Sequence, residues 1–225
     1  MDELRATVPQ EEEPGFEAQF ESGEHVEIGD GAEHGGVIEM HGEQVTVGEI
    51  NALADFYASF DAMHYDDDRH FQVILEHLRM EIANPGSVSP EKWDEITGGE
   101  YTRLAQENNS HFGASNEALV PESGSGTADN GSTWEGNFRN ALGEAQLAAE
   151  FRSRPSVDPG TIAALDQQAR AINAFGEHFL TDAYSAGHLF NKADYMAQVR
   201  DALTEAKGAD RQGMFNRVAQ GVWIE

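Results

Sequence analysis

Three residues whose side chains can bind a metal ion lie close together near the end of a long apolar segment. The stretch HFLTDAYSAGHLF, residues 178–190, contains His178, Asp182 and His188. On an ideal helix, at about 100° per residue, Asp182 lies about 40° to one side of His178 and His188 about 80° to the other. The three can face one space, especially if Gly187 bends the backbone before His188. Two imidazoles and a carboxylate there would suit a zinc-type ion, and the alternative is a buried helix with incidental polar residues.

Two more candidate ligands occur on earlier segments whose neighbouring positions are apolar. Asp55 lies within ALADFYA, and His111 lies within NNSHFG. A buried carboxylate without a partner is costly, so Asp55 needs a cation or several donors if it is buried. Taken singly, Asp55 suits a cap or an exposed position, and His111 suits a core or surface histidine. Their coincidence with the residues of the 178–188 stretch favours one shared site, which contains no thiolate because the chain has no cysteine.

The segments that carry these residues are predicted to be helical. A capping box at Thr46 and Glu49 predicts a helix over about 47–60, which contains Asp55. The longest predicted helix starts near Thr161 and continues through SAGH to residue 188, because its apolar positions keep a 3.6-residue period. Other helices are predicted over FQVILEHLRMEIAN, SPEKWDEI, GGEYTRLAQENNSHFG, TWEGNFRNALGEAQLAAEFRS, KADYMAQVRDALTEA and GMFNRVAQGVWI.

The N-terminal part is predicted to differ from this helical body. Glycines in SGEHVEIGDGAEHGG predict a loop, and the short β-rich runs that follow predict a small hairpin across HGEQ. Residues 1–21 are rich in Glu and Pro and predict an acidic disordered arm, or one that a protein or particle partner orders. The expected fold class is therefore an all-α, multi-helix bundle with a small irregular or β-hairpin N-terminal part, in one domain over residues 22–225.

Composition restricts the partners that this chain can have. Forty-one acidic residues against fourteen basic ones give a formal net charge of −27, which argues against general nucleic-acid binding. The chain has no run of eighteen apolar residues, so no membrane span is predicted. The acidic N-terminus does not have the pattern of a secretory signal peptide, so the expected location is the cytoplasm or release by a non-classical route.

The spacing H-x3-D-x5-H, formed by His178, Asp182 and His188, resembles the central metal-ligand run of the zinc-dependent phospholipase C and single-strand nuclease superfamily. In that all-α family, an aspartate on an earlier helix and a histidine in an HF context complete the first metal site. Asp55 and His111 match these two positions in order. The resemblance covers roughly residues 25–190, and its most specific part is the 178–188 run.

The resemblance implies further roles for these residues. A family histidine near the N-terminus, in a pattern like H-x2-I-x4-A, helps to bind a further metal, and His25 in HVEIGDGA matches it with one residue of slack. By the same resemblance, Asp55 would be the general base of a zinc-dependent phosphodiesterase that acts on phospholipids or other phosphate esters. The family normally carries H-x3-E after the GH histidine, and no histidine follows His188. One well-formed site, from Asp55, His111, His178 and Asp182, is therefore expected, and further complete sites are not.

Two alternatives to an enzyme remain open at this point. Strings such as HFLTDAYSAGH and NNSHF are also similar to domains found with phage-tail-like contractile injection systems. That resemblance implies a non-catalytic structural or cargo component that kept the fold and one metal. The other alternative is a plain helical interaction domain that binds no metal.

Overall fold

The computed structural model of the chain describes residues 22–32, 36–114, 128–185 and 188–205. Most of these residues are helical, and one antiparallel hairpin lies near the N-terminus, so the predicted all-α fold class is confirmed. The predicted arm over residues 1–21 and the predicted helix GMFNRVAQGVWI lie outside the described residues. The elements are α2 (Ser22–Ala32), β1 (Val37–Met40), β2 (Glu43–Thr46), α3 (Val47–Leu53), α4 (Phe60–His64), α5 (Asp68–Ala83), α6 (Pro90–Ile96), α7 (Glu100–Glu107), the 3₁₀ turn η1 (Asn109–His111), α8 (Asn130–Arg152), α9 (Pro159–Asp182) and α10 (Lys192–Glu205).

The hairpin and the helix after it form where the sequence predicts them. His41 and Gly42 turn the chain between β1 and β2, both with positive φ (52° and 76°). Thr46 and Glu49 form the expected capping box, in which each side chain accepts a hydrogen bond from the other residue's backbone N–H. The Arg79 guanidinium of α5 also donates to both carboxylate oxygens of Glu49, which ties α5 to the start of α3.

The prediction of one continuous helix over 47–60 is wrong. α3 ends at Leu53, and Asp55 lies in the turn that follows. Ser59 has an extended backbone (φ −163°, ψ 163°) and caps the separate helix α4 by accepting a hydrogen bond from Ala62 N. The break lets Phe56 turn into the core, where its ring lies 4.3 Å from that of Trp93 between centroids.

The predicted loop over residues 22–32 is a helix, α2, and its glycines serve a close helix crossing. A Cβ atom at Gly48 would lie 2.2 Å from the carbonyl oxygen of Val26, and one at Gly29 would lie 2.6 Å from Gly48 Cα. α2 and α3 can therefore touch backbone to backbone only because both positions lack a side chain. The Asp30 carboxylate accepts a hydrogen bond from Gly48 N at the same crossing.

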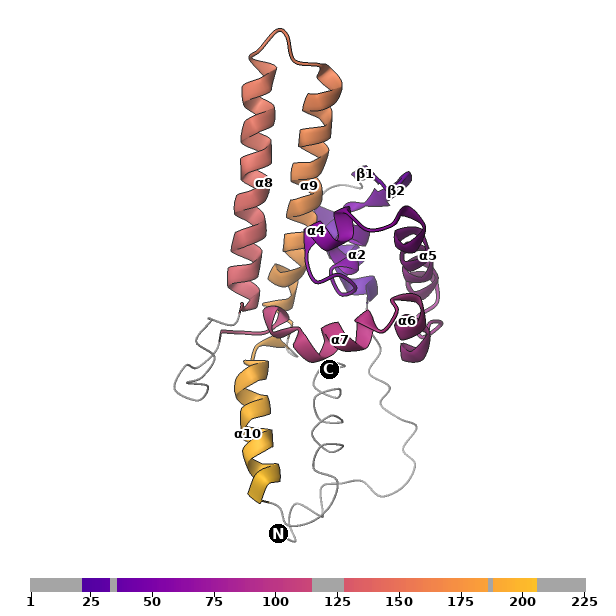
Figure 1. Ribbon diagram of the computed structural model, residues 1–225, viewed down its shortest axis with the longest axis vertical. Coiled ribbons are helices and arrows are strands. Elements are labelled where there is room, and N and C mark those ends of the chain that lie inside the picture. Colours follow the sequence, from indigo (N-terminus) through magenta and orange to yellow (C-terminus); the bar gives the residue numbers. More distant parts are fainter. Residues whose placement is uncertain (1–21, 33–35, 115–127, 186–187, 206–225) are drawn as a thin grey trace.

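α8 and α9 form a long antiparallel hairpin that extends beyond the other elements (Figure 1). α9 begins at Pro159 after the N-cap Asp158 and ends at Asp182. It does not continue to His188, because the chain turns after Asp182 and His188 follows in a separate short turn. Gly187, which was expected to bend the backbone there, lies outside the described residues.

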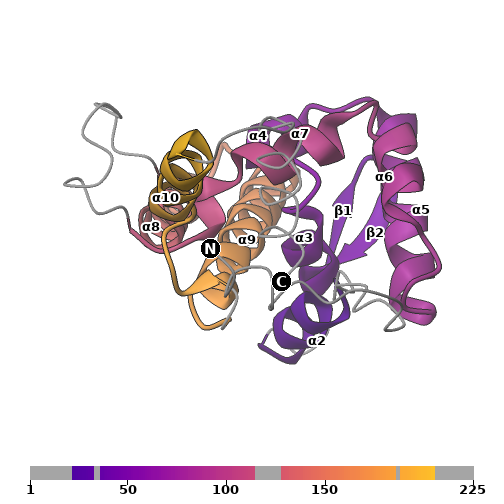
Figure 2. The same cartoon turned by 90° about the horizontal axis from the view of Figure 1, so that it is seen from below.

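Seen from below, α9 lies between α8 and α3, and the β-hairpin lies between α3 and α5 (Figure 2). Apolar residues of α3, α5, α6 and α9 form the core, with fully buried side chains such as Ile50, Leu75, Trp93 and Phe175. The half of α9 nearest its C-terminus is therefore packed on both sides. Within the described ranges, no helix has both the length and the apolar composition needed to cross a bilayer.

Candidate metal centre

The structure brings all six candidate ligands into one cluster, although they come from five separate segments. His25 lies in α2, Asp55 in the turn after α3, and His111 in η1. α9 contributes His178 and Asp182, one turn apart on the same face, and the short turn after α9 contributes His188. These candidate ligands are His25, Asp55, His111, His178, Asp182 and His188.

Three ligand atoms come closest together at the centre of this cluster. His111 Nδ1 lies 2.8 Å from His178 Nε2 and 2.8 Å from Asp182 Oδ2. The third side of this triangle, from His178 Nε2 to Asp182 Oδ2, measures 3.1 Å. A ring nitrogen either donates or accepts a hydrogen bond, so with Asp182 ionised, in every protonation state of the two rings, at least one side of the triangle joins two lone pairs or two N–H groups. A cation above the triangle would contact all three atoms, and the zinc bond lengths of about 2.0–2.2 Å fit a triangle of this size.

Asp55 adds a fourth ligand atom beside the triangle. Its Oδ1 lies 3.4 Å from His178 Nε2 and 3.9 Å from His111 Nδ1. The side chain of Asp55 is 12% exposed, whereas those of His178 and Asp182 are 0% and 2% exposed. Of Asp55, His178 and Asp182, Asp55 is thus the residue that solvent or a substrate reaches most readily.

The second oxygen of Asp182 faces the two remaining histidines. Asp182 Oδ1 lies 3.7 Å from His25 Nε2 and 4.0 Å from His188 Nδ1. The ring of His25 also packs on that of His178, with 4.3 Å between centroids. Asp182 therefore offers one oxygen to His111 and His178 and the other to His25 and His188. Two sets of three residues could each hold a metal ion, because the ligand atoms within each set lie within 4.8 Å of one another. The sets are His25–Asp55–His178 and His111–His178–Asp182.

Burial and the attraction between opposite charges have opposite effects on the pKa values of the central residues. Burial opposes the ionisation of Asp182, but the adjacent rings of His178 and His111 hold the pKa of its carboxyl well below the usual range. Burial also opposes a charge on His178, but Asp182 and Asp55 together raise the pKa of this imidazole to about 9. With both carboxyl groups ionised, a single imidazolium would leave negative charge in this desolvated site.

The outer residues respond mainly to burial. Burial raises the pKa of Asp55, lowers the pKa of His25 to about 3, and also lowers the pKa of His188. The buried Nδ1 atoms of His25 and His188 have no hydrogen-bond partner among the described residues. A divalent cation would balance both carboxylates and bind the neutral imidazoles, which is the protonation state that metal binding requires.

Backbone hydrogen bonds connect the segment of His111 with the segment of His188. Gly113 N lies within hydrogen-bonding distance of the carbonyl oxygens of both His188 and Phe190, and the Asn191 side chain donates to Gly113 O. Lys192 donates its buried Nζ to Ala105 O and to Asn108 Oδ1, just before η1. The predicted helix over GGEYTRLAQENNSHFG is wrong in its last part, because α7 ends at Glu107 and His111 is placed by these contacts instead.

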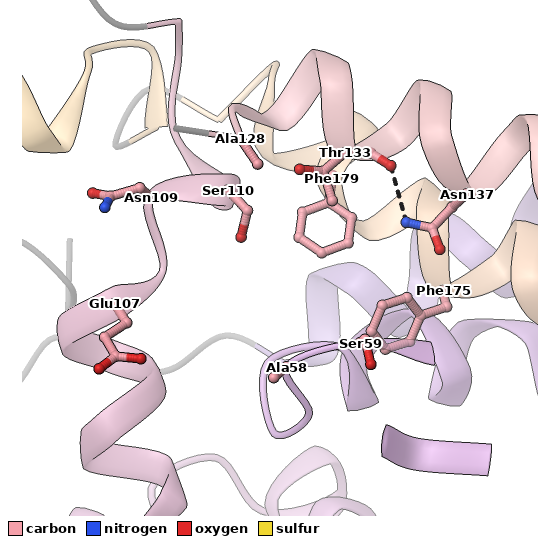
Figure 3. Close-up of a pocket in the computed structure, with 10 residues that line it drawn as sticks. All are labelled: Ala58, Ser59, Glu107, Asn109, Ser110, Ala128, Thr133, Asn137, Phe175 and Phe179. Atoms are coloured by element: carbon pink, nitrogen blue, oxygen red, sulfur yellow. Dashed lines mark hydrogen bonds between the residues drawn. The ribbon is translucent and has the colours of Figure 1, made fainter. Parts of the chain in front are cut away.

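Two cavities open beside the cluster. The smaller, of about 130 Å³, is lined by Asp55 and His111 together with Tyr57, Arg103 and Ser110, among others. The larger, of about 380 Å³, lies between the start of α8, the end of α9 and η1 (Figure 3). Its polar residues did not stand out in the sequence, because serine, threonine and asparagine on helix surfaces have no distinctive spacing.

The donor set is made of imidazole nitrogens and carboxylate oxygens. Such a set is typical of zinc and other first-row transition metals, whereas magnesium and calcium prefer oxygen ligands alone. The buried histidines and aspartates could therefore hold a metal ion. Comparison of the chain with protein-family models, with curated proteins and with solved structures finds no match, so the geometry of this centre is what bears on function.

Proposed function

We propose that the protein is a zinc-dependent hydrolase of phosphodiesters, with Asp55, His111, His178 and Asp182 as the ligands of its principal metal. The observation that carries this proposal is the triangle of His111 Nδ1, His178 Nε2 and Asp182 Oδ2, with sides of 2.8, 2.8 and 3.1 Å. When bound, zinc would polarise a phosphoryl oxygen and lower the pKa of a coordinated water.

Asp55 is the residue best placed to take a proton during the reaction. Its carboxylate borders both the ligand triangle and the smaller cavity, so one side chain can touch the metal centre and a substrate. A general base must lie within hydrogen-bonding reach of the proton that it removes, and Asp55 is partly accessible where His178 and Asp182 are not.

Charge supports a small phosphate ester over a polynucleotide. A chain with a net charge of −27 repels extended polyanions, and the repulsion grows with the number of phosphates that the partner carries. Among the described residues, Arg103 is the only arginine or lysine that lines the two cavities, and it forms ion pairs with Glu100 and Glu107. The substrate class is therefore a phospholipid headgroup or another compact phosphodiester.

One observation favours a second candidate, a non-catalytic component of a phage-tail-like particle that kept the fold. Asp182 Oδ1 is the only carboxylate oxygen of the described ranges within 4.0 Å of His188 Nδ1, and no histidine follows His188 in the sequence to complete a site around it. Such a protein would hold one structural zinc without hydrolysing any ester.

Hydrolysis of bis(p-nitrophenyl) phosphate by zinc-loaded protein tests the proposal. The wild type should release p-nitrophenolate, and Asp55→Asn should lower kcat at least about 100-fold, because a general base contributes about 10²–10⁴. Asp61→Asn, at an exposed position in α4, is the matched control and should keep full activity.

Tight zinc binding without any hydrolysis would favour the structural component over the enzyme. Full activity of Asp55→Asn would instead show that Asp55 is not the base. Absence of both zinc binding and hydrolysis would favour a plain helical interaction domain that binds no metal.

A further inference from the structure

The larger cavity is lined by residues from four parts of the chain that the fold brings together. Figure 3 shows the Phe179 ring between Ser110 on one side and Asn137 on the other, with Ser59 and Phe175 nearby. A volume of about 380 Å³ is within the range of small-molecule sites.

This cavity shares part of its lining with the smaller cavity at the metal centre. Ala58, Glu107, Ser110 and Phe179 line both of them. The smaller cavity reaches Asp55 and His111, so a ligand that spans the two would place one end at the metal ligands and the other among the residues of α8 and α9.

The lining of the larger cavity is rich in neutral hydrogen-bonding groups. Besides Ser59 and Ser110 it contains Asn109, Thr133 and Asn137, and Asn137 donates its side-chain NH₂ to Thr133 O. The buried Oγ1 of Thr133 has no hydrogen-bond partner within the part of the chain that the structure describes. Because an unpaired buried hydroxyl is costly, this atom points to a polar group that arrives with a ligand.

Charge and aromatic exposure exclude a cationic group as the natural occupant. Glu107 is the only carboxylate among the described residues of the lining, and Arg103 forms an ion pair with it. An aromatic cage for a quaternary ammonium must present ring faces, but Phe175 and Phe179 are only 1% and 3% exposed. The two rings form an apolar floor beneath the hydroxyl and amide groups.

We propose that the larger cavity binds the neutral, hydroxyl-rich group of the substrate, a polyol or sugar attached to the phosphate. This inference rests on the proposed phosphodiesterase function and deepens it by naming the substrate class. Hydroxyls of the ligand would bond to Thr133, Asn137 and Ser110.

Calorimetric titration of inositol 1-phosphate and of phosphocholine into the protein with added zinc tests this subsite. Both ligands are phosphomonoesters, so a diesterase does not consume them during the measurement. Inositol 1-phosphate should bind at least about tenfold more tightly than phosphocholine. Thr133→Val and Asn137→Leu should each weaken inositol 1-phosphate about threefold to tenfold, the loss of one hydrogen bond. Asn140→Leu, exposed on the same helix, should change nothing.

The outcomes separate the subsite from the catalytic proposal. Preferential binding with the expected variant effects, but no hydrolysis of bis(p-nitrophenyl) phosphate, would support the subsite and refute the enzyme. Hydrolysis combined with equal binding of both ligands, tighter binding of phosphocholine, or unchanged affinity in Thr133→Val and Asn137→Leu would overturn the subsite. Absence of binding by inositol 1-phosphate at millimolar concentration would overturn it as well.

Discussion

Asp182 lies at the centre of the candidate metal site, where its two oxygens face nitrogen atoms of four histidines. Its Oδ2 contacts His111 and His178, and its Oδ1 faces His25 and His188. A carboxylate can serve both sides only while it is ionised, and an amide in its place offers one oxygen and a competing NH₂ group.

Asp182→Asn should therefore lower zinc affinity at least about 100-fold, more than the loss of a residue that only orients a ligand. Competition with a chelator of known affinity measures the change. Asp166→Asn, which lies on α9 but in an exposed ion pair with Arg152, is the control and should bind zinc like the wild type. Equal affinity in Asp182→Asn would show that this carboxylate is not a ligand.

Lys192 is a buried cation close to the centre, and its burial has a consequence for stability. Its side chain is 1% exposed, and burial lowers its pKa from 10.5 to about 8. The unfolded chain then binds more protons than the folded one between pH 8 and 10.5, so this residue makes stability rise with pH across that window.

Lys192→Met removes this titration while keeping most of the apolar volume. Relative to Lys192→Met, the wild type should gain up to roughly 3 kcal/mol in unfolding free energy from pH 7.5 to 10. Urea denaturation of both proteins at several pH values measures the difference. A difference that stays constant with pH would mean that Lys192 carries the same charge in both states.

At the scale of elements, His25 reaches the centre because α2 crosses α3 at two glycines. A Cβ at Gly48 would meet Val26 O at 2.2 Å, so Gly48→Ala must push the helices apart and should cost about 1–3 kcal/mol of stability. Gly143→Ala is the matched control, since nothing lies within 4 Å of its added Cβ, and should stabilise α8 by about 0.5–1 kcal/mol. Thermal unfolding measures both changes, and equal effects of the two substitutions would argue against the close crossing.

The sequence could predict the elements whose formation depends on local signals. The capping box at Thr46, the Ser89–Pro90 start of α6 and the amphipathic run of α5 all appear where they were expected. α2 could not be predicted, because glycines at positions 29 and 31 read as a loop unless the backbone of α3 is known to lie against them.

The ligands were recognised from the sequence, but the backbone that holds them was not. Asp55 and His111 were placed on helices and lie instead in a turn and in η1. These conformations depend on long-range contacts, such as the Lys192 side chain bound to Ala105 O and Asn108 Oδ1, which no local pattern reveals. The larger cavity also escaped prediction, because its lining comes from four separate parts of the chain and its polar residues have no distinctive spacing.

For the whole molecule, the net charge of −27 opposes compaction. Salt shortens the screening length from about 10 Å at 0.1 M to about 3 Å at 1 M, which weakens this repulsion. The melting temperature should therefore rise as sodium chloride increases over that range, and potassium chloride should give a similar rise. Differential scanning calorimetry at fixed pH and zinc concentration measures it. A flat or falling melting temperature would contradict a stability limited by charge repulsion.

Zinc binding by the intact protein tests the central claim, that the buried histidines and aspartates form a metal centre. Chelator-treated protein should be titrated with zinc by calorimetry, followed by thermal unfolding with and without the metal. We predict tight binding of at least one zinc per chain and a higher melting temperature for the loaded protein, because the metal binds only the folded state. His178→Ala should lose both effects, while His77→Ala, whose Nδ1 bonds to Val73 O on α5, should keep them. Failure of the wild type to bind zinc, or undiminished binding by His178→Ala, would contradict the account.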